Sequence, residues 1–412
     1  MNLLLNFLRF SASIILYLIK IAIAKQEKTK MKITNDVIYV GVTDRVTDLF
    51  ESQYLIPNGI SYNSYVINDK KRAIMDSVDI RFAEEWLANI DRVLDGDAPD
   101  YLIVQHMEPD HSASIIEFAN KYPEAQIVSS AKAFTMMNSF FGCDFSDRRL
   151  VVAEGSTLLL GTHELTFITA PMVHWPEVIM TYDKRDKVLY SADAFGKFGA
   201  PDIDDGWVDE ARRYYIGIVG KYGVQVQSVL KKAAALDIAA ICPLHGPVLS
   251  DNLGFYISLY DKWSSYTPEE DGVTIAYSSI YGNTRAAAEL LADTLRGAGC
   301  AVAIYDLSRC DKAEAIASAF RYSKLVLASS TYNADVFPSM RAYISGLVER
   351  GFQNRTVAFI ENGSWAPMAA KVMRASLESA KNITYAENSV KILSALNAES
   401  RAALSALADE LK

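Results

Sequence analysis

The sequence predicts an α/β protein in two parts, a layered α/β sandwich over residues 31–265 and a doubly wound parallel sheet over residues 272–412. Three observations lead to this prediction. Short apolar segments and helical patterns recur along most of the chain. A polar stretch at residues 264–272 interrupts that rhythm, as a linker would. Side chains able to hold a metal or a phosphate follow the predicted strands on either side of this stretch.

The composition sets limits on the class of protein. A chain of 412 residues, half of them apolar, is long enough for two domains with cores of their own. Its net charge of −9, without a run of Lys and Arg among aromatic residues, argues against a nucleic-acid partner. The four cysteines form no Cys-x-x-Cys pair, which predicts free thiols in a reducing cytoplasm.

The first 30 residues allow two interpretations. The strongly apolar segment 3–24 ends in Ala-Ile-Ala, which resembles the cleavage site of a signal peptide, and such a segment could also serve as an anchor. However, Lys20 shortens the apolar core, and Met31-Lys32-Ile33 is typical of a cytoplasmic start. We favour a start that was set too early and exclude residues 1–30 from the prediction of the fold.

In the first part, short apolar runs bounded by Asp, Asn and Gly predict strands, and helical periodicity predicts helices. The predicted strands cover residues 37–41, 64–67, 101–105, 126–129, several segments of 150–170, 187–190 and 238–243. The predicted helices cover residues 80–94, 112–121 and 132–141. Because strands and helices both occur in clusters, a layered sandwich fits better than an alternating barrel.

A cluster of metal-binding residue types follows the strand at 101–105. Four of the six side chains in the run from residue 106 to residue 111 can bind a metal: His106, Glu108, Asp110 and His111. Glu108 is a hard, negatively charged oxygen donor. Carboxylate-rich sites of this kind suit iron or manganese better than zinc, which favours three neutral histidines at such a face.

Three further candidate ligands each lie just past the carboxyl end of a predicted strand: His174, Asp193 and His245. Loops from separate strands can meet around one cavity at that edge of a sheet. A lone histidine is more often a structural residue than a ligand. Here four of the five histidines fall in this series, which leaves His163 as a bystander. The sequence therefore predicts a two-metal site.

In the second part, a strand at 273–277, a hydroxyl-rich turn and a helix at 285–296 together predict an anion site. A plain helix N-cap would explain the turn equally well. Two further loops, after strands at 325–328 and 356–360, favour a ligand with a phosphate and a planar ring. The predicted binding residues are Ser279, Tyr281, Gly282, Asn283, Thr284, Ser330, Thr331, Tyr332, Asn333, Asn362, Gly363, Ser364 and Trp365. The absence of a Gly-x-Gly-x-x-Gly turn and of a Walker lysine argues against dinucleotides and nucleoside triphosphates.

The order of the two parts and nearly all of these motifs resemble the flavodiiron proteins over residues 31–412. In that family a metallo-β-lactamase-like αββα sandwich precedes a flavodoxin-like domain, and the metal site follows the pattern His-x-Glu-x-Asp-His, His, Asp, His. The resemblance implies that His106, Glu108 and His174 hold one iron, that Asp110 and His245 hold the other, and that Asp193 bridges them. His111 is turned away from the metals in some members. The resemblance also implies FMN in the second domain.

The same resemblance implies reduction of dioxygen to water, or of nitric oxide to nitrous oxide, with electrons that FMN supplies. It further implies an external electron donor, such as rubredoxin or a flavin or deazaflavin reductase. A head-to-tail homodimer, or a dimer of dimers, would bring the flavin of one chain to the metals of the other, because each site lies on its own domain and the linker is short.

Two other classes of function stay open. One is a metallo-β-lactamase-type hydrolase with an attached flavodoxin domain, against which Glu108 speaks. The other is an electron carrier whose metal site is only structural. Structural sites are closed, whereas three carboxylates and three or four imidazoles leave open positions on two metals, so this is the weaker alternative.

Overall fold

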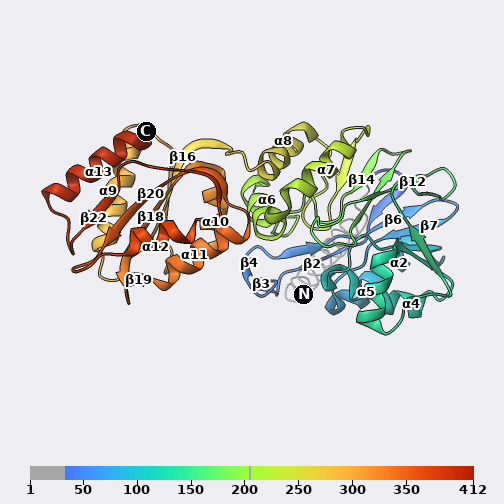
Figure 1. The fold of residues 1–412 in the computed structure, drawn as a ribbon. Helices are drawn as coiled ribbons and strands as arrows, with labels where there is room; N and C mark the ends of the chain where they lie inside the picture. The colour runs from blue at the N-terminus through green and yellow to red at the C-terminus, as the bar shows by residue number, and fades with distance from the viewer. Residues whose placement is uncertain (1–32, 204–205) are drawn as a thin grey trace, which may run out of the picture.

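The computed structural model describes residues 33–203 and 206–412, so the N-terminal segment 1–30 lies outside the described residues. Two lobes follow one another along the chain (Figure 1). The first lobe contains two large sheets, and the second is built on a single sheet. No helix in the described ranges has the length and apolar character needed to cross a membrane.

Two sheets form the centre of the first lobe. The first has the strand order β1-β6-β7-β8-β9-β10 and the second the order β11-β12-β13-β14-β15. The strands of the first sheet are β1 (Val37–Tyr39), β6 (Tyr65–Asn68), β7 (Arg72–Met75), β8 (Tyr101–Ile103), β9 (Gln126–Ser130) and β10 (Arg149–Val152). Those of the second are β11 (Thr157–Leu159), β12 (Glu164–Thr169), β13 (Ile179–Asp183), β14 (Val188–Tyr190) and β15 (Ala240–Cys242). Two small pairs accompany them: β2 (Val42–Asp44) with β5 (Ile60–Tyr62), and β3 (Leu49–Phe50) with β4 (Tyr54–Leu55).

Helices cover the outer faces of these two sheets, so the lobe has four layers in the order α, β, β, α (Figure 1). Residues of both sheets share one apolar core between them. On the first sheet lie η1 (Ile80–Phe82), α2 (Ala83–Leu94), α3 (Pro109–Ser112), α4 (Ile115–Lys121) and α5 (Ala131–Phe141). On the second lie α6 (Val208–Tyr214), η2 (Tyr215–Val219), η3 (Gly220–Tyr222), α7 (Gly223–Ala233) and α8 (Leu253–Ser264). The predicted sandwich is therefore confirmed.

The helix predicted at 112–121 is in fact two helices, α3 and α4, and the first begins earlier, at Pro109. The break has a local cause. The carbonyl oxygen of His111 accepts hydrogen bonds from the backbone N–H (3.3 Å) and the hydroxyl (2.6 Å) of Ser77, which lies in the loop after β7. That carbonyl is therefore engaged outside the helical hydrogen-bond ladder, and Asp110 and His111 lie in the short helix itself.

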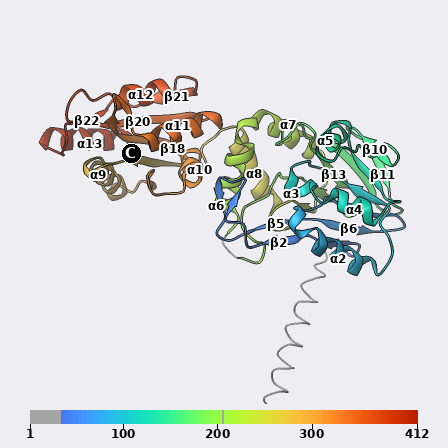
Figure 2. The same ribbon diagram turned by 90° about the horizontal axis from the view of Figure 1, so that it is seen from below.

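The second lobe contains a parallel sheet in the order β17-β16-β18-β20, with both β21 and β22 paired to β20. Its strands are β16 (Glu270–Ser278), β17 (Val302–Asp306), β18 (Tyr322–Tyr332), β20 (Gln353–Asn362), β21 (Lys381–Tyr385) and β22 (Val390–Ile392), with β19 (Asp335–Val336) antiparallel to β18. Its helices are α9 (Asn283–Gly297), α10 (Lys312–Arg321), α11 (Pro338–Glu349), α12 (Ala369–Ser376) and α13 (Ala398–Leu411). Helices α9 and α13 lie on one face, and α11 and α12 on the other (Figure 2). This is the predicted doubly wound sheet.

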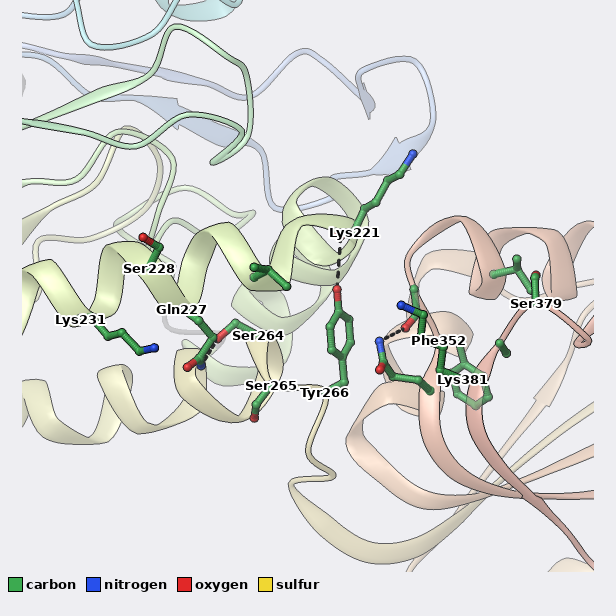
Figure 3. A pocket seen from close by; sticks show the side chains of 15 residues that line it. Lys221, Gln227, Ser228, Lys231, Ser264, Ser265, Tyr266, Phe352, Ser379 and Lys381 are labelled. Carbon is green, nitrogen blue, oxygen red and sulfur yellow. Dashed lines mark hydrogen bonds between the residues drawn. The ribbon is translucent and has the colours of Figure 1, made fainter. Parts of the chain in front are cut away.

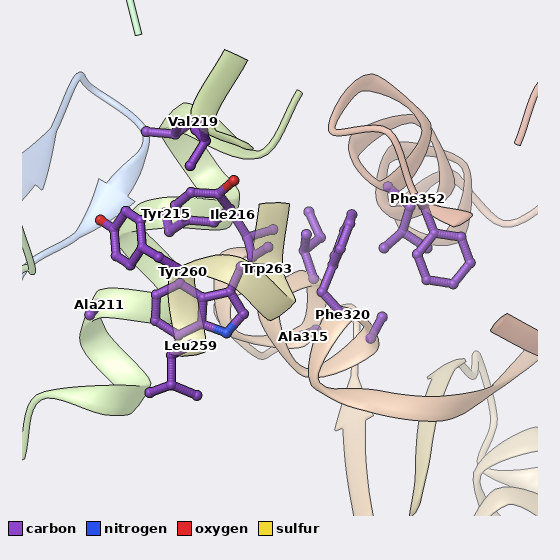
Figure 4. Close-up of a cluster of buried hydrophobic side chains, with 14 of the residues drawn as sticks. Ala211, Tyr215, Ile216, Val219, Leu259, Tyr260, Trp263, Ala315, Phe320 and Phe352 are labelled. Carbon is purple, nitrogen blue, oxygen red and sulfur yellow. The ribbon is translucent and has the colours of Figure 1, made fainter. Parts of the chain in front are cut away.

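The connection between the lobes is shorter than the sequence predicts. Helix α8 ends at Ser264 and β16 begins at Glu270, three residues before the predicted strand. Glu270 pairs with Tyr322 ahead of an irregularity in the register, which extends the strand backwards. An apolar cluster continues across the connection, from Tyr260 and Trp263 on α8 to Phe320 and Phe352 of the second lobe (Figure 4).

Polar contacts also join the lobes. The guanidinium of Arg213 lies 3.2 Å from Asp311, and Arg350 donates to the hydroxyl of Tyr54 over 2.9 Å. A cavity of about 730 Å³ lies beside these contacts, between α7 and the start of β20, with Tyr266 on its wall (Figure 3). Phe320, Arg350 and Phe352 lie at the amino ends of β18 and β20, whose carboxyl ends lie at the opposite edge of the sheet. Asp311 lies in the loop between β17 and α10.

Candidate metal centre and cofactor pocket

The structure brings all seven predicted metal ligands together. Each lies past the carboxyl end of a strand, and both sheets of the first lobe contribute. His106 follows β8, and the helix α3 places Glu108, Asp110 and His111 beside it. The loops after β12, β14 and β15 provide the remaining three, His174, Asp193 and His245.

One group of ligand atoms consists of His106, Glu108, His174 and Asp193, whose atoms lie within 4.8 Å of one another. Nε2 of His174 is 3.0 Å from Oε2 of Glu108 and 3.2 Å from Oδ2 of Asp193. Nε2 of His106 is 3.3 Å and 3.1 Å from the same two oxygens. These four atoms surround a single point, as the donors of one metal ion would.

A second group consists of Asp110, His111 and His245. Oδ2 of Asp110 lies 3.1 Å from Nε2 of His111 and 3.3 Å from Nε2 of His245. Asp193 faces both groups, because its other oxygen, Oδ1, is 3.6 Å from the Nε2 atoms of both histidines. The carboxylate of Asp193 therefore lies between two ligand sets, in the position of a bridge. His111 points into the second set and is not turned away.

The residues present fit two cations. Both oxygens of Asp110 and both oxygens of Asp193 are buried and accept no aligned hydrogen bond from the described residues. Buried carboxylates without partners are costly unless a cation compensates them. The Nε2 atoms of His111 and His245 are 3.0 Å apart, although two neutral imidazoles can share only one proton there. Metal ions between these atoms would satisfy both the carboxylates and the lone pairs.

Neighbouring groups orient two of the histidines. Nδ1 of His106 lies 2.9 Å from Oε1 of Glu177, which also accepts a hydrogen bond from the backbone N–H of Met107 over 2.8 Å. Nδ1 of His245 lies 2.7 Å from the carbonyl oxygen of Ser61. A proton on each Nδ1 leaves Nε2 free to bind a metal. The sequence did not predict a role for Glu177, because no motif or strand-end pattern distinguishes this carboxylate from others in the chain.

Without metals, the cluster is a dense array of opposite charges. Burial alone would lower the pKa of His174, but Asp193 and Glu108 raise it to about 9. Burial alone would raise the pKa of Asp193, but His106 and His174 hold it well below its usual range. The carboxylates are therefore ionised and ready to bind cations at neutral pH, and metals must displace protons from the histidines.

A further carboxylate that the sequence analysis missed lies at the mouth of the centre. Glu51 is in the turn between β3 and β4, and its side chain contacts Glu108. Loss of water around the carboxyl, together with the negative charge of Glu108, raises the pKa of Glu51 to about 7. Leu49 and Leu55 flank this turn and are exposed, so an apolar rim surrounds an acidic tip.

His163, the predicted bystander, lies apart from the centre. It is buried beside Asp183 and Asp186 in a separate cluster. Its Nδ1 is 2.7 Å from Asp183, and its Nε2 is 2.6 Å from the guanidinium of Arg185. The cation of Arg185 occupies the place that a metal would need, so this cluster has the contacts of an ion-pair network.

The second lobe has a cavity of about 680 Å³ at the carboxyl edge of its sheet. Twelve of the thirteen predicted residues line it, and the exception, Gly282, is the N-cap of α9 with φ 92°. Five further residues line the cavity and were not predicted from the sequence: Ile280, Ala334, Ala366, Met368 and Ser394. Most of these are apolar or small, and their residue types alone do not point to a ligand.

Backbone and hydroxyl groups shape this cavity. Helix α9 begins at Asn283, so its first N–H groups face the cavity, and the hydroxyls of Thr284 and Ser330 lie 3.0 Å apart beside them. None of the described lining residues is Lys or Arg. A phosphate would therefore be held by N–H groups, hydroxyls and the helix dipole. The rings of Tyr332 and Trp365 are exposed at the rim, where a planar ring system could stack.

Comparisons with known proteins support both predicted domains. Residues 60–246 match the ODP family of β-lactamases, and residues 275–381 match the flavodoxin family. The anaerobic nitric oxide reductase flavorubredoxin of Salmonella arizonae is 29% identical over 361 residues, which is 84% of this chain and 75% of that protein.

Two solved structures are similar across nearly the whole chain. Rubredoxin oxygen:oxidoreductase from Desulfovibrio gigas has a TM-score of 0.85 at 26% identity, covering 93% of this chain and 97% of that one. The flavodiiron protein of Giardia intestinalis has a TM-score of 0.85 at 27% identity, covering 93% and 96%.

Fold, metal centre and cofactor pocket together define a class of protein in which a β-lactamase-like metal domain is joined to a flavodoxin domain. In fold and in the order of its two domains, the chain is similar over nearly its whole length to the flavodiiron proteins. The flavodoxin domain implies FMN, and the family implies a diiron site in the first lobe.

Proposed function

We propose that this protein is an oxidoreductase that reduces dioxygen to water, nitric oxide to nitrous oxide, or both. The observation that carries this proposal is the carboxylate of Asp193 between two sets of ligands, in a chain that also has a flavin-type pocket. The relatives support it, since one is a nitric oxide reductase and another an oxygen oxidoreductase. A hydrolase needs no flavin, and Glu108 departs from the usual zinc pattern, so the hydrolase alternative is not favoured.

In this proposal each ligand has a role. His106, Glu108, His174 and Asp193 hold one iron, while Asp110, His111 and His245 hold the other with Asp193. Two irons and FMN supply the electron storage that a multi-electron reduction requires. Glu177 and the carbonyl of Ser61 keep the Nε2 atoms of His106 and His245 directed inward. The buried setting keeps bulk water away from the ligands.

The test combines cofactor analysis with gas consumption on one preparation. We expect about two irons and one FMN per chain, together with consumption of dioxygen or nitric oxide when a chemical reductant keeps the flavin reduced. Protein in which zinc fills both positions despite available iron, and which consumes neither gas, would contradict the proposal. The hydrolase alternative would gain support if that zinc form cleaved thioester or lactam substrates.

For the partners, we infer a separate electron donor, such as rubredoxin or a flavin or deazaflavin reductase. The name of the Desulfovibrio gigas relative supports a rubredoxin-type donor. We also place the protein in the cytoplasm, which is consistent with the four cysteines of the described residues being free thiols.

We further propose that electrons cross between two chains of a head-to-tail homodimer. The flavin pocket lies at the carboxyl ends of β16, β18 and β20, whereas Phe320, Arg350 and Phe352, which contact the first lobe, lie at the amino ends of β18 and β20. At about 3.3 Å per residue, the strand β20 separates pocket and lobe contact by roughly 30 Å. Both sites have exposed apolar rims, with Leu49 and Leu55 at the metal centre and Tyr281 and Trp365 at the pocket. A two-fold axis could pair one rim with the other twice.

A mixing experiment tests the crossing. One variant lacks iron (His106→Ala with Asp193→Ala), and the other lacks FMN (Ser279→Ala with Asn283→Ala). Each is inactive alone, but a mixed dimer keeps one intact pair of flavin and iron sites and should recover activity. If labelled subunits exchange and no activity returns, electrons do not cross between chains.

A further inference from the structure

A series of oxidisable aromatic side chains leads from the metal centre to the surface. The ring of Tyr260 is 5.3 Å from that of Trp263, which is stacked on Trp207 at 5.9 Å with an interplanar angle of 13°. Trp207 lies 4.7 Å from Tyr256. Tyr260 and Trp263 are buried, as Figure 4 shows, while Trp207 and Tyr256 are half-buried at the outside of the lobe.

The inner end of this series is coupled to the ligand Asp193. The hydroxyl of Tyr260 accepts a hydrogen bond from the backbone N–H of Phe195, two residues beyond Asp193, over 2.5 Å. The rings of Phe195 and Tyr260 are stacked at 4.2 Å. One hydrogen bond and a short piece of backbone therefore connect the phenol to the centre of the ligand cluster.

The middle of the series has a partner for a positive charge. The indole N–H of Trp263 donates to Oε1 of Glu269 over 2.7 Å, and Glu269 is itself paired with Arg212. An indole that loses an electron becomes acidic at this nitrogen. The Glu269 carboxylate can stabilise the cation or accept its proton, which lowers the cost of oxidising Trp263.

Other aromatic contacts of the centre do not continue in this way. Tyr214 lies 5.4 Å from His245, but its ring contacts lead next to Phe198, which is hard to oxidise. Trp175 lies 5.3 Å from His106, and its ring contacts among the described residues are with histidine ligands. Tyr62 contacts His111 and His245, but its ring leads next to Phe82. Of these contacts among the described residues, the path through α8 is the one in which Tyr and Trp rings continue to the surface, after a first link through Phe195.

We propose that the residues Tyr260, Trp263, Trp207 and Tyr256 form an electron path that supplies the metal centre when the flavin cannot. The inference rests on the proposed function. Reduction of dioxygen to water takes four electrons and two ferrous irons hold two, so oxidised FMN leaves a deficit of two. Each missing electron leaves Trp263 and crosses the ring of Tyr260, whose phenol keeps its proton, while the indole proton of Trp263 passes to Glu269. Trp263 then takes an electron from Trp207, and the proton held by Glu269 returns to it. Tyr256 or a thiol-class reductant in solution refills Trp207, and two thiols become one disulfide as they supply the two missing electrons and two protons.

The physical advantage is protection. Without such a path, an under-reduced centre would take electrons from its own histidine ligands. With it, the oxidation appears at half-buried rings that a solute can reach, and the ligands survive. The path matches short ring separations with a gradient of exposure from the buried Tyr260 to the half-buried Trp207.

The experiment uses the full chain with ferrous iron and oxidised FMN, mixed with dioxygen and frozen at short times. We expect an electron paramagnetic resonance signal of a tryptophanyl or tyrosyl radical, which a thiol removes. Trp263→Phe should abolish the tryptophanyl signal, because it interrupts the path between Tyr260 and Trp207. Trp207→Phe should abolish quenching by thiol and the oxidation products found by mass spectrometry at Trp207 and Tyr256.

Trp86→Phe is the matched control, because Trp86 is as buried as Trp263 but lies against α4 in a different core. If Trp263→Phe does not fold, Trp207→Phe still tests the path. The indole nitrogen of Trp207 makes no hydrogen bond to the described residues, so this change should leave the fold intact. Radical signals unchanged in both path variants, or no radical in a wild-type sample that consumes dioxygen, would overturn the inference. A sample that consumes neither dioxygen nor nitric oxide would instead contradict the proposed function.

Discussion

The metal centre and the flavin pocket differ in how far their residues are exposed to solvent. The metal ligands are buried inside the first lobe, with His106 fully covered and Asp193 at 1% exposure. The flavin pocket is an open edge, where Tyr281 is 93% and Trp365 is 82% exposed. The ligands come from four loops on two sheets, whereas the pocket uses loops after neighbouring strands of one sheet. A buried charged site therefore depends on the whole core, and an open pocket depends on local turns.

The largest effect is expected at the ligand that both metal sets share. Asp193→Asn should remove nearly all iron, because its two oxygens face different groups. His111→Asn should remove at most the iron of the second set. Iron per chain, measured by elemental analysis on protein with native circular dichroism, distinguishes the two. Equal loss in both variants would show that Asp193 does not bridge.

Removal of the metals should make the stability of the first lobe depend on pH. The folded pKa of His174, about 9, is above its ordinary value near 6.5, so its protonation stabilises the fold fully below pH 6.5. That contribution is lost as pH rises through 9, and it is worth up to roughly 3 kcal/mol. Urea unfolding of metal-free protein at pH 6.5 and 9 measures it. In His174→Asn, the free energy of unfolding should be nearly the same at both pH values. A pH dependence that persists in this variant would show that another group is responsible.

Contacts between the lobes should have an intermediate effect. Arg213 is buried and pairs with both Glu210 and Asp311, so Arg213→Gln takes this partner from two half-buried carboxylates and should cost about 3 kcal/mol of unfolding free energy. Arg285→Gln removes an exposed pair with Glu289 and should leave the free energy of unfolding almost unchanged, because water screens this pair. Denaturant titration of both variants compares them. A cost for Arg213→Gln as small as that of the exposed control would show that the lobes are only loosely joined.

The smallest effect is expected from the largest deletion. A chain reduced to residues 270–412 retains every strand-end loop of the pocket, so its affinity for FMN should change by less than about tenfold, or 1.4 kcal/mol. Quenching of flavin fluorescence measures the affinity, with the full chain as reference. A shortened chain that folds but does not bind FMN would mean that the open pocket depends on the first lobe after all.

Local sequence was sufficient for the elements and for the type of chemistry. Strands that end in His, Asp or hydroxyl clusters predicted the seven candidate metal ligands that the structure gathers and most of the residues that line the pocket, because carboxyl ends of strands meet at one edge whatever the details of the core. The pattern around Glu108 also predicted iron or manganese in preference to zinc. These features follow from residue type and period, which a single sequence contains.

Only the tertiary structure decided how these groups face one another. It directed His111 into the second ligand set, brought Glu177 onto His106 from 71 residues away, and placed Glu51 beside Glu108. It also divided the helix after His106, because Ser77 in the loop after β7 donates hydrogen bonds to a carbonyl of that helix. Each of these depends on contacts between segments distant in the chain. Such contacts are set by the packing of two sheets against each other, and the residue types and local periods of the sequence do not specify them.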